Sequence, residues 1–338
     1  MEAQNELVAQ SQFLVFEAVE TLIKQGRVLI IGGSNALLRR LPAGDWVGGS
    51  AKHFLLDSTP QADEEKLMVA DVTPYVSEVR MRTYSEYAIH NLGPDRYTHG
   101  FSVVLLPAFS AIHRAFALYA VTAASTPDSL LTGWVTSEEM DAQGESIPKV
   151  YCGDEGGYFT DKAVALHCRL RPEYLAQIDI LTPSGEATGD VLRFDEAGFT
   201  IGDVMVNGQY QNLAKYWRAH YAGQDCFLMA DLQGMPSILH PLAPIGQRSM
   251  TFVAPVIPGV EYHVARSTPG QLAHYTQQLA AAKALHPLLA FHCLAYYAML
   301  RHGLQGAGAP DGIFAAGEVA NVLMNRTSVV LHIKRLTL

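Results

Sequence analysis

Near the end of the chain, four side chains of chemically useful types follow or interrupt short apolar runs: Cys293, Glu318, Asn325 and Thr327. A cysteine thiolate can act as a nucleophile, and a carboxylate can act as an acid or a base. Glu318 precedes an apolar segment, where a carboxylate is costly unless it is hydrogen-bonded. It would therefore either cap a helix start or accept a hydrogen bond from a ligand. Asn325 and Thr327 precede the last predicted strand, as turn-forming residues or as ligand contacts.

Cys293 ends a short apolar segment that is typical of a buried strand. A reactive thiol needs a nearby base or positive charge in order to form the thiolate. His292 cannot act on Cys293 directly, because neighbouring residues of a strand point to opposite faces of the sheet. The same objection applies to the pair His167 and Cys168. A buried structural cysteine is therefore the alternative to a catalytic or redox role.

A glycine-rich turn near the N-terminus is a second candidate site. Gly32, Gly33, Ser34 and Asn35 follow the apolar segment RVLII and precede a short helical segment. Free backbone N–H groups and the helix dipole favour a bound carboxylate or phosphate at such a place. The turn has neither the GK[ST] of a P-loop nor the GxGxxG of a dinucleotide site. A tight turn that needs glycine is the structural alternative.

The thirteen histidines of the chain form no recognisable metal motif. HExxH, HxH and paired-cysteine patterns are absent, so the sequence predicts no metal site. Covalent haem would need CxxCH, whereas non-covalent haem needs only one axial histidine and stays open as a cofactor. The sequence also lacks GxSxG and the protein-kinase motifs. An enzyme is therefore the less favoured class, although the question of catalysis stays open.

The composition of the 338-residue chain predicts a folded, acidic protein with one large domain or about two smaller ones. A hydrophobic content of 49% allows a large core. The formal charge of −9 disfavours nucleic acid and membrane surfaces as partners, because both attract basic proteins. The chain shows neither a signal-peptide pattern nor the apolar run of about 20 residues that spans a bilayer. With four scattered cysteines, it is predicted to be cytoplasmic, with reduced thiols.

The spacing of apolar residues predicts helices over 5–25, 108–123 and 268–285. Many short strands lie between them, separated by Gly, Pro or Asp turns. Helices and strands do not follow the regular βαβ order of a doubly wound sheet, and no tandem repeat of short period is evident. We therefore predict an α+β fold with two lobes of mixed, largely antiparallel sheets flanked by helices.

The C-terminal third of the chain, roughly residues 245–335, resembles the FIST family. The resemblance follows an ordered set of motifs: IPGVEYHVARS, then LLAFHC, then GIFAAGE, and finally NRTSVVLHI. Two N-terminal segments, RVLIIGGSNALL and WVGGS, are compatible with the first domain of that family. The chain departs from the family after the cysteine: many members carry Gly-Arg soon after it, whereas here Leu294-Ala295-Tyr296-Tyr297 follows, with tyrosines where an arginine would help to bind an anion.

The resemblance implies a FIST N-like lobe over 1–240 and a FIST C-like lobe over 241–338. It also implies a cytoplasmic sensory or signal-transduction protein that binds a small ligand, such as an amino acid, and acts through a separate partner protein. By the same resemblance, the four C-terminal candidate residues lie at family positions. A non-covalent haem-based gas sensor and an enzyme that uses Cys293 or Glu318 are the alternatives.

Overall fold

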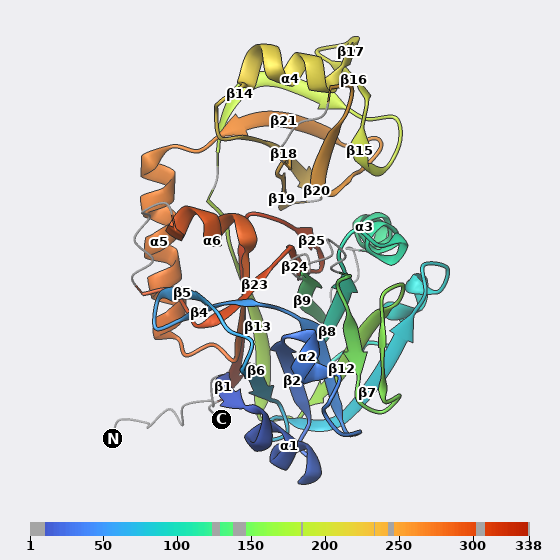
Figure 1. Ribbon diagram of the computed structural model, residues 1–338, viewed down its shortest axis with the longest axis vertical. Coiled ribbons are helices and arrows are strands. Elements are labelled where there is room, and N and C mark those ends of the chain that lie inside the picture. The colour runs from blue at the N-terminus through green and yellow to red at the C-terminus, as the bar shows by residue number, and fades with distance from the viewer. Residues whose placement is uncertain are drawn as a thin grey trace.

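The computed structural model describes residues 11–123, 129–137, 147–183, 185–232, 234–242, 247–301 and 308–336, and Figure 1 shows how their elements are arranged. The fold is α+β, as predicted from the sequence. Strands outnumber helices, and three parallel strand pairs stand among many antiparallel ones in the described part of the chain. None of the helices in this part combines the length and the apolar composition that crossing a bilayer requires.

Three six-stranded sheets form the body of the molecule. The first has the order β1 (Gln12–Val15), β6 (Lys66–Asp71), β2 (Leu29–Gly33), β3 (Trp46–Ser50), β10 (Val150–Cys152), β11 (Gly157–Phe159). The second has the order β7 (Val76–Tyr84), β12 (Ala163–Leu170), β8 (Gly100–Pro107), β9 (Leu130–Thr136), β24 (Gly317–Ala320), β25 (Val322–Met324). The third has the order β13 (Tyr174–Leu181), β26 (Ser328–Arg335), β22 (Leu289–Cys293), β23 (Gly312–Ala315), β4 (His53–Leu56), β5 (Thr59–Ala62).

The three sheets are built from the same succession of elements. A central strand, β2, β8 or β22, leads through a helix to a parallel strand, β3, β9 or β23. The connecting helices are α2 (Asn35–Leu38), α3 (Ala111–Ala123) and α6 (Leu294–Arg301). A later strand, β6, β12 or β26, returns antiparallel to the central strand. The chain therefore contains three repeats of one plan, over residues 12–71, 76–170 and 174–335.

Each repeat also sends a β-hairpin into the sheet of another repeat. The hairpin β4–β5 of the first repeat pairs with β23 of the third. The hairpin β10–β11 of the second repeat pairs with β3 of the first, and β24–β25 of the third pairs with β9 of the second. Every sheet is therefore completed by another repeat. The repeats differ in length, so a search for a short fixed period does not detect them.

The hydrophobic core lies where the three sheets meet. The central strands are buried along nearly their whole length, as expected for strands covered on both faces. Trp134 of β9 stacks on Phe291 of β22, with ring centroids 5.1 Å apart. A Cβ atom on Gly32 of β2 would lie 2.4 Å from Cδ1 of Ile313 in β23. The second and first sheets therefore both pack closely against the third.

The third repeat carries an insertion between β13 and β22, which forms a further six-stranded sheet, here called the inserted sheet. Its order is β17 (Gln209–Asn212), β16 (Asp203–Val206), β14 (Glu186–Arg193), β21 (Glu261–Arg266), β18 (Cys226–Leu232), β19 (Met235–Leu239). The pair β15 (Gly198–Ile201) and β20 (Met250–Val256) and the helix α4 (Leu213–Tyr221) accompany it. Figure 1 shows this group at one end of the molecule, above α3 and α6.

The helix α5 (Pro269–Ala284) leads from the inserted sheet back to β22. Thr268 and Gln271 form a reciprocal capping box at its start, which satisfies backbone N–H groups that the first helical turn leaves free. Residue 240, where the sequence analysis divided the chain, lies within the insertion. Strands on both sides of it pair, as β18 does with β21, and the division into two domains stays a prediction.

The N-terminal segment differs from its prediction. A helix was predicted over 5–25, but Gln12–Val15 forms β1, antiparallel to β6, and α1 spans Phe16–Lys24. Pairing at the sheet edge overrides the helical pattern of the four residues in β1. Residues 5–10 lie outside the described residues. Predicted helices 108–123 and 268–285 correspond to α3 and α5, and the short helix η1 (Ile89–Leu92) precedes β8.

Candidate functional site

The glycine-rich turn lies at the end of β2 and the start of α2. Ser34 occupies the N-cap position of α2 without a side-chain capping bond, and the helix has only four residues. Asn35 accepts a hydrogen bond of 2.9 Å from the hydroxyl of Tyr151. Gly32 and Gly33 both lack room for a Cβ atom, because Gly32 lies against Ile313 of the third sheet and Gly33 against Leu67 of the adjacent strand β6. None of the four predicted residues lines the main pocket described below.

Three of the four C-terminal candidates do come together. The Thr327 hydroxyl donates to Oε2 of Glu318 at 2.6 Å, and the Thr327 backbone N–H donates to the same oxygen at 3.3 Å. The Cys293 backbone N–H donates to the Thr327 carbonyl at 3.0 Å. Glu318 and Thr327 are fully buried, and Cys293 is 3% exposed. β22, β24 and β26 therefore place a thiol, a carboxyl group and a hydroxyl in one cluster.

Burial dominates the electrostatics of this cluster. It raises the pKa of Glu318 well above the usual value, although hydrogen bonds from Thr327 and an interaction with the Cys293 thiol act in the opposite direction. Burial also raises the pKa of the Cys293 thiol, and the charge of Glu318 adds to the effect. The backbone N–H groups of Ala295 and Arg326 face the sulfur and lower its pKa. Oε1 of Glu318 has no hydrogen-bond partner among the described residues.

Asn325 supports the loop rather than the cluster itself. Its Nδ2 donates to the Ala316 carbonyl at 3.0 Å, which ties the end of β25 to the residue between β23 and β24. Its side chain is 1% exposed. Asn325 therefore fixes the position of Ala316, which lines the main pocket.

Arg326 lines the main pocket described below, although no pattern in the sequence singles it out. Its guanidinium donates to both carboxylate oxygens of Asp225, at 3.1 and 2.5 Å, and to the Ser267 hydroxyl at 2.6 Å. Nη1 also lies 3.3 Å from Nδ1 of His240. The guanidinium stacks 4.5 Å above the ring centroid of Phe227. Its backbone has a φ of 57°, a left-handed conformation in which non-glycine residues are uncommon.

A pocket of about 670 Å³, here called the main pocket, adjoins this cluster. Its lining includes the carboxyl ends of β8, β9, β22 and β23, where ligands commonly bind in open sheets of this kind. Residues of the insertion line its other side. The lining residues are Ala108, Phe109, Ser137, Pro148, Asp225, His240, Leu242, Val253, Cys293, Leu294, Ala295, Ala298, Met299, Ala316 and Arg326.

The polar end of the main pocket carries little net charge. Burial opposes ionisation of Asp225, but hydrogen bonds and the charge of Arg326 outweigh it and lower the pKa of this carboxyl. Burial, together with the charge of Arg326, lowers the pKa of His240 to about 4. His240 is therefore neutral at pH 7. Because its Nδ1 faces an Arg326 N–H, we assign the imidazole proton to Nε2.

This tautomer does not fit haem ligation by His240. An axial histidine binds iron through a ring nitrogen that carries no proton. In His240, the nitrogen free of Arg326 is the one that carries the proton. His240 could bind iron through Nε2 only if the contact between Nδ1 and Arg326 were lost.

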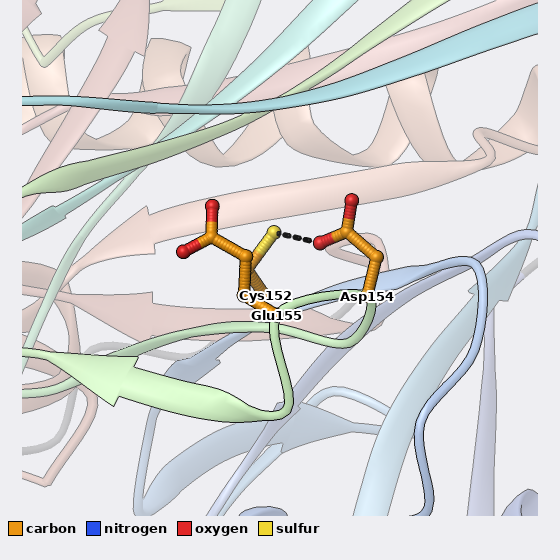
Figure 2. A group of neighbouring side chains, drawn as sticks. All are labelled: Cys152, Asp154 and Glu155. Carbon is orange, nitrogen blue, oxygen red and sulfur yellow. Dashed lines mark hydrogen bonds between the residues drawn. The ribbon is translucent and has the colours of Figure 1, made fainter.

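A group with metal-ligand chemistry lies elsewhere, at the turn between β10 and β11. Ligand atoms of Cys152, Asp154 and Glu155 all lie within 4.8 Å of one another. Figure 2 shows the three side chains, with the Cys152 thiol donating to Oδ1 of Asp154 at 2.8 Å. Burial and the neighbouring carboxylates raise the pKa of this thiol, which disfavours the thiolate that a metal needs. The sequence analysis, which looked for paired cysteines, passed over this single-cysteine group.

A second buried polar chain crosses the second sheet. The Ser102 hydroxyl lies 2.8 Å from Nδ1 of His167, and Nε2 of His167 lies 2.8 Å from the hydroxyl of Tyr84. The Tyr84 hydroxyl donates to Oδ2 of Asp95 at 2.8 Å. His167 and Ser102 are fully buried and do not line the main pocket. The chain therefore satisfies polar groups inside the sheet.

Comparison with known proteins gives a family but not an activity. The model of a family described as "Family of unknown function (DUF6976)" matches residues 14–334, so the chain belongs to this family. A search of curated proteins finds no match.

Proposed function

We propose that this member of the DUF6976 family is a small-ligand-binding sensory protein whose ligand occupies the main pocket. The observation that carries the proposal is the pocket itself, with apolar walls and a few convergent polar groups. Its volume of about 670 Å³ lies within the range of about 300–1,000 Å³ that is common for small-molecule sites. Such a combination holds a ligand by its apolar surface and orients it by its polar end.

The polar end indicates the chemistry of the ligand. Arg326 and Asp225 neutralise each other, and His240 is neutral at pH 7, so a highly charged ligand would find no counter-charge. The Asp225 side chain is 52% exposed and can accept further hydrogen bonds, while Nε2–H of His240 can donate one. The expected ligand is mainly apolar, with one polar group that both donates and accepts hydrogen bonds.

In this proposal, the inserted sheet and the three-repeat body form two lobes whose bounds differ from the predicted 1–240 and 241–338, and the ligand lies between them. The sensory role and the separate partner protein rest on the resemblance to the FIST family, whereas the cytoplasmic location rests on the four scattered cysteines. Binding would act on the contacts between Arg326 and the insertion, because these contacts border the pocket. A partner that reads this change completes the proposed signalling function.

The proposal predicts that filling the pocket abolishes ligand binding. Ala298 of α6 is exposed and lines the pocket, so Ala298→Trp places an indole inside it without disturbing the core. Native mass spectrometry and thermal shift against a panel of apolar metabolites would identify ligands of the wild type. The variant should lose the thermal shift that each of them gives.

The matched control is Ala281→Trp, which adds the same side chain to an exposed position of α5 away from the pocket lining. This control should keep the thermal shift. Equal binding by the wild type and Ala298→Trp, or no binding across the panel, would contradict the proposal.

A further inference from the structure

The three repeats place different residues at the point where the central strand ends. Gly33 ends β2, Pro107 ends β8 and Cys293 ends β22, each paired with the last residue of the neighbouring parallel strand. Of these three, Cys293 alone has a nucleophilic side chain. It is also the one that lines the main pocket. The third repeat therefore presents a thiol to whatever the pocket binds.

Backbone groups beside Cys293 favour a negatively charged sulfur, although burial and the charge of Glu318 outweigh them and raise the pKa of the thiol. The eight-residue helix α6 starts immediately after it, and the backbone N–H of Ala295 faces the sulfur. The backbone N–H of Arg326 faces it from the loop before β26. Hydrogen bonds from backbone N–H groups and the positive end of a helix both favour a thiolate.

The buried carboxyl group of Glu318 supplies the second, independent observation. Two hydrogen bonds from Thr327 hold Oε2, and Oε1 has no hydrogen-bond partner among the described residues. The carboxyl group interacts with the Cys293 thiol. A fully buried carboxyl oxygen without a partner is costly, and it persists where function needs it. A group that exchanges a proton with the thiol would explain this oxygen.

We propose that Cys293 is a nucleophile that adds to an aldehyde ligand in the main pocket, with Glu318 as the acceptor of the thiol proton. The step occurs in molecules whose Glu318 is ionised, a fraction that the raised pKa of Glu318 reduces and that grows as the pH rises. In these molecules the S–H bond breaks as its proton moves to Oε1 of the Glu318 carboxylate. The sulfur forms a bond to the carbonyl carbon, and the π electrons of the C=O bond move to the oxygen. That oxygen takes the proton back from Glu318, which gives a hemithioacetal. The aldehyde oxygen only accepts hydrogen bonds, whereas the hydroxyl of the hemithioacetal both donates and accepts them, as the polar end of the pocket requires. The addition is reversible and needs neither an oxidant nor a leaving group.

Several other charged or titratable groups face this pair. Burial raises the pKa of Tyr275 of α5 well above its usual value, and the charges of Glu318 and Cys293 add to the effect. Arg326 favours the thiolate through its charge. Asp225 and His240 line the same pocket as the thiol. The inference rests on the same pocket as the proposed function, but it is tested by covalent labelling rather than by ligand affinity.

The first experiment measures alkylation of the full-length native protein by iodoacetamide, with the labelled cysteine identified by peptide mass mapping. The new S–C bond releases iodide, and the thiol proton goes to Glu318. Cys293 should react, whereas Cys168, which is fully buried in β12, serves as the internal control. Labelling of Cys293 only after unfolding would overturn the proposal.

The variant Glu318→Gln tests whether Glu318 accepts the thiol proton or only lies beside the thiol. Loss of the acceptor should slow alkylation of Cys293 by about 10²-fold. If Glu318 acted only through its negative charge, the same variant would make the thiolate easier to form and would speed the reaction. An unchanged or faster rate therefore refutes the role of Glu318.

Thr327→Val gives a second variant that keeps the side-chain shape. It removes the hydroxyl that donates to Oε2, so Glu318 should ionise at higher pH, and the rise of the alkylation rate with pH should move in the same direction. A pH profile identical to that of the wild type would contradict proton transfer to Glu318.

Butanal then tests the ligand class. It should protect Cys293 from iodoacetamide in the wild type, and dialysis should restore labelling because the addition is reversible. Butanal without any protective effect would exclude the aldehyde, while a thermal shift with non-covalent ligands would still support the proposed function.

Discussion

Arg326 reaches from the loop before β26 to Asp225, His240 and Ser267 of the insertion, and its side chain is 2% exposed. Replacing it with methionine removes charge-assisted hydrogen bonds and leaves their partners unsatisfied. Because Asp225 is half-exposed and can bind water instead, we expect Arg326→Met to lower the free energy of unfolding by about 1–3 kcal/mol. Urea denaturation at pH 7 would measure the change.

The matched comparison is Arg193→Met, which breaks an ion pair between two exposed side chains, Arg193 and Glu261. Exposed pairs contribute little, so this variant should unfold close to the wild-type urea concentration. Similar midpoints for the two variants would mean that Arg326 does not hold the insertion to the body.

At the residue scale, the sequence identified one half of the candidate site. Cys293, Glu318 and Thr327 stand out because polar groups interrupt apolar runs, and they do lie together. Arg326 lies between two of the predicted positions, but a lone arginine resembles a surface charge. Its partners Asp225 and His240 come from an insertion far away in sequence, and spacing carries no information about such contacts.

At the scale of the sheet, His167 links the strands β8, β12 and β7 through Ser102 and Tyr84. Burial lowers the pKa of His167 from 6.5 to about 4. Between these values the unfolded chain binds a proton that the folded protein does not bind. The contribution of His167 to stability is therefore present above pH 6.5 and is lost as the pH falls to about 4, by about 3 kcal/mol.

The test compares the wild type with His167→Met, by urea denaturation from pH 7 to pH 4. The variant should be less stable at pH 7, because Ser102 and Tyr84 lose their partner, but its stability should fall less steeply with pH. Other buried histidines and the acidic residues act equally on both proteins, so the difference in slope isolates His167. Parallel curves for the two proteins would contradict the prediction.

At the element scale, α3 and α5 were predictable because their apolar spacing is long and regular, and α5 begins with a proline after a capping threonine. The start of α1 was not predictable, because Gln12–Val15 joins a sheet edge through pairing with β6. Gly32 and Gly33 were predicted as an anion site or as a tight turn, whereas both lie within β2. Glycine is required at both positions because a Cβ atom would meet Ile313 or Leu67 of other strands. That contact depends on tertiary packing, which a local sequence pattern does not contain.

At the scale of the whole molecule, the α+β class followed from the mixture of elements, but the threefold plan did not. The repeats share an order of strands rather than a sequence period, and the insertion makes the third repeat much longer than the others. The exchange of hairpins between repeats could not be predicted from the sequence, because β4–β5 pairs with a strand more than two hundred residues later. Topology of this kind appears only when the pairing partners are known.

Hairpin exchange has a consequence for unfolding. The first sheet is incomplete without β10–β11 of the second repeat, and the second is incomplete without β24–β25 of the third. Opening one sheet therefore exposes edges and core of another, so we expect the three sheets to unfold together. Trp46 of the first sheet and Trp134 of the second report on them separately, since both are buried.

The measurement uses two double variants of the three-tryptophan chain. Trp217→Phe with Trp46→Phe leaves only Trp134, and Trp217→Phe with Trp134→Phe leaves only Trp46. In each variant, tryptophan fluorescence and circular dichroism should each show one urea transition. The two transitions should have the same midpoint, as two-state unfolding requires. A tryptophan transition that precedes the loss of secondary structure would show that one sheet opens alone. In that case the exchanged hairpins do not couple the repeats, and each sheet is an independent unit of stability.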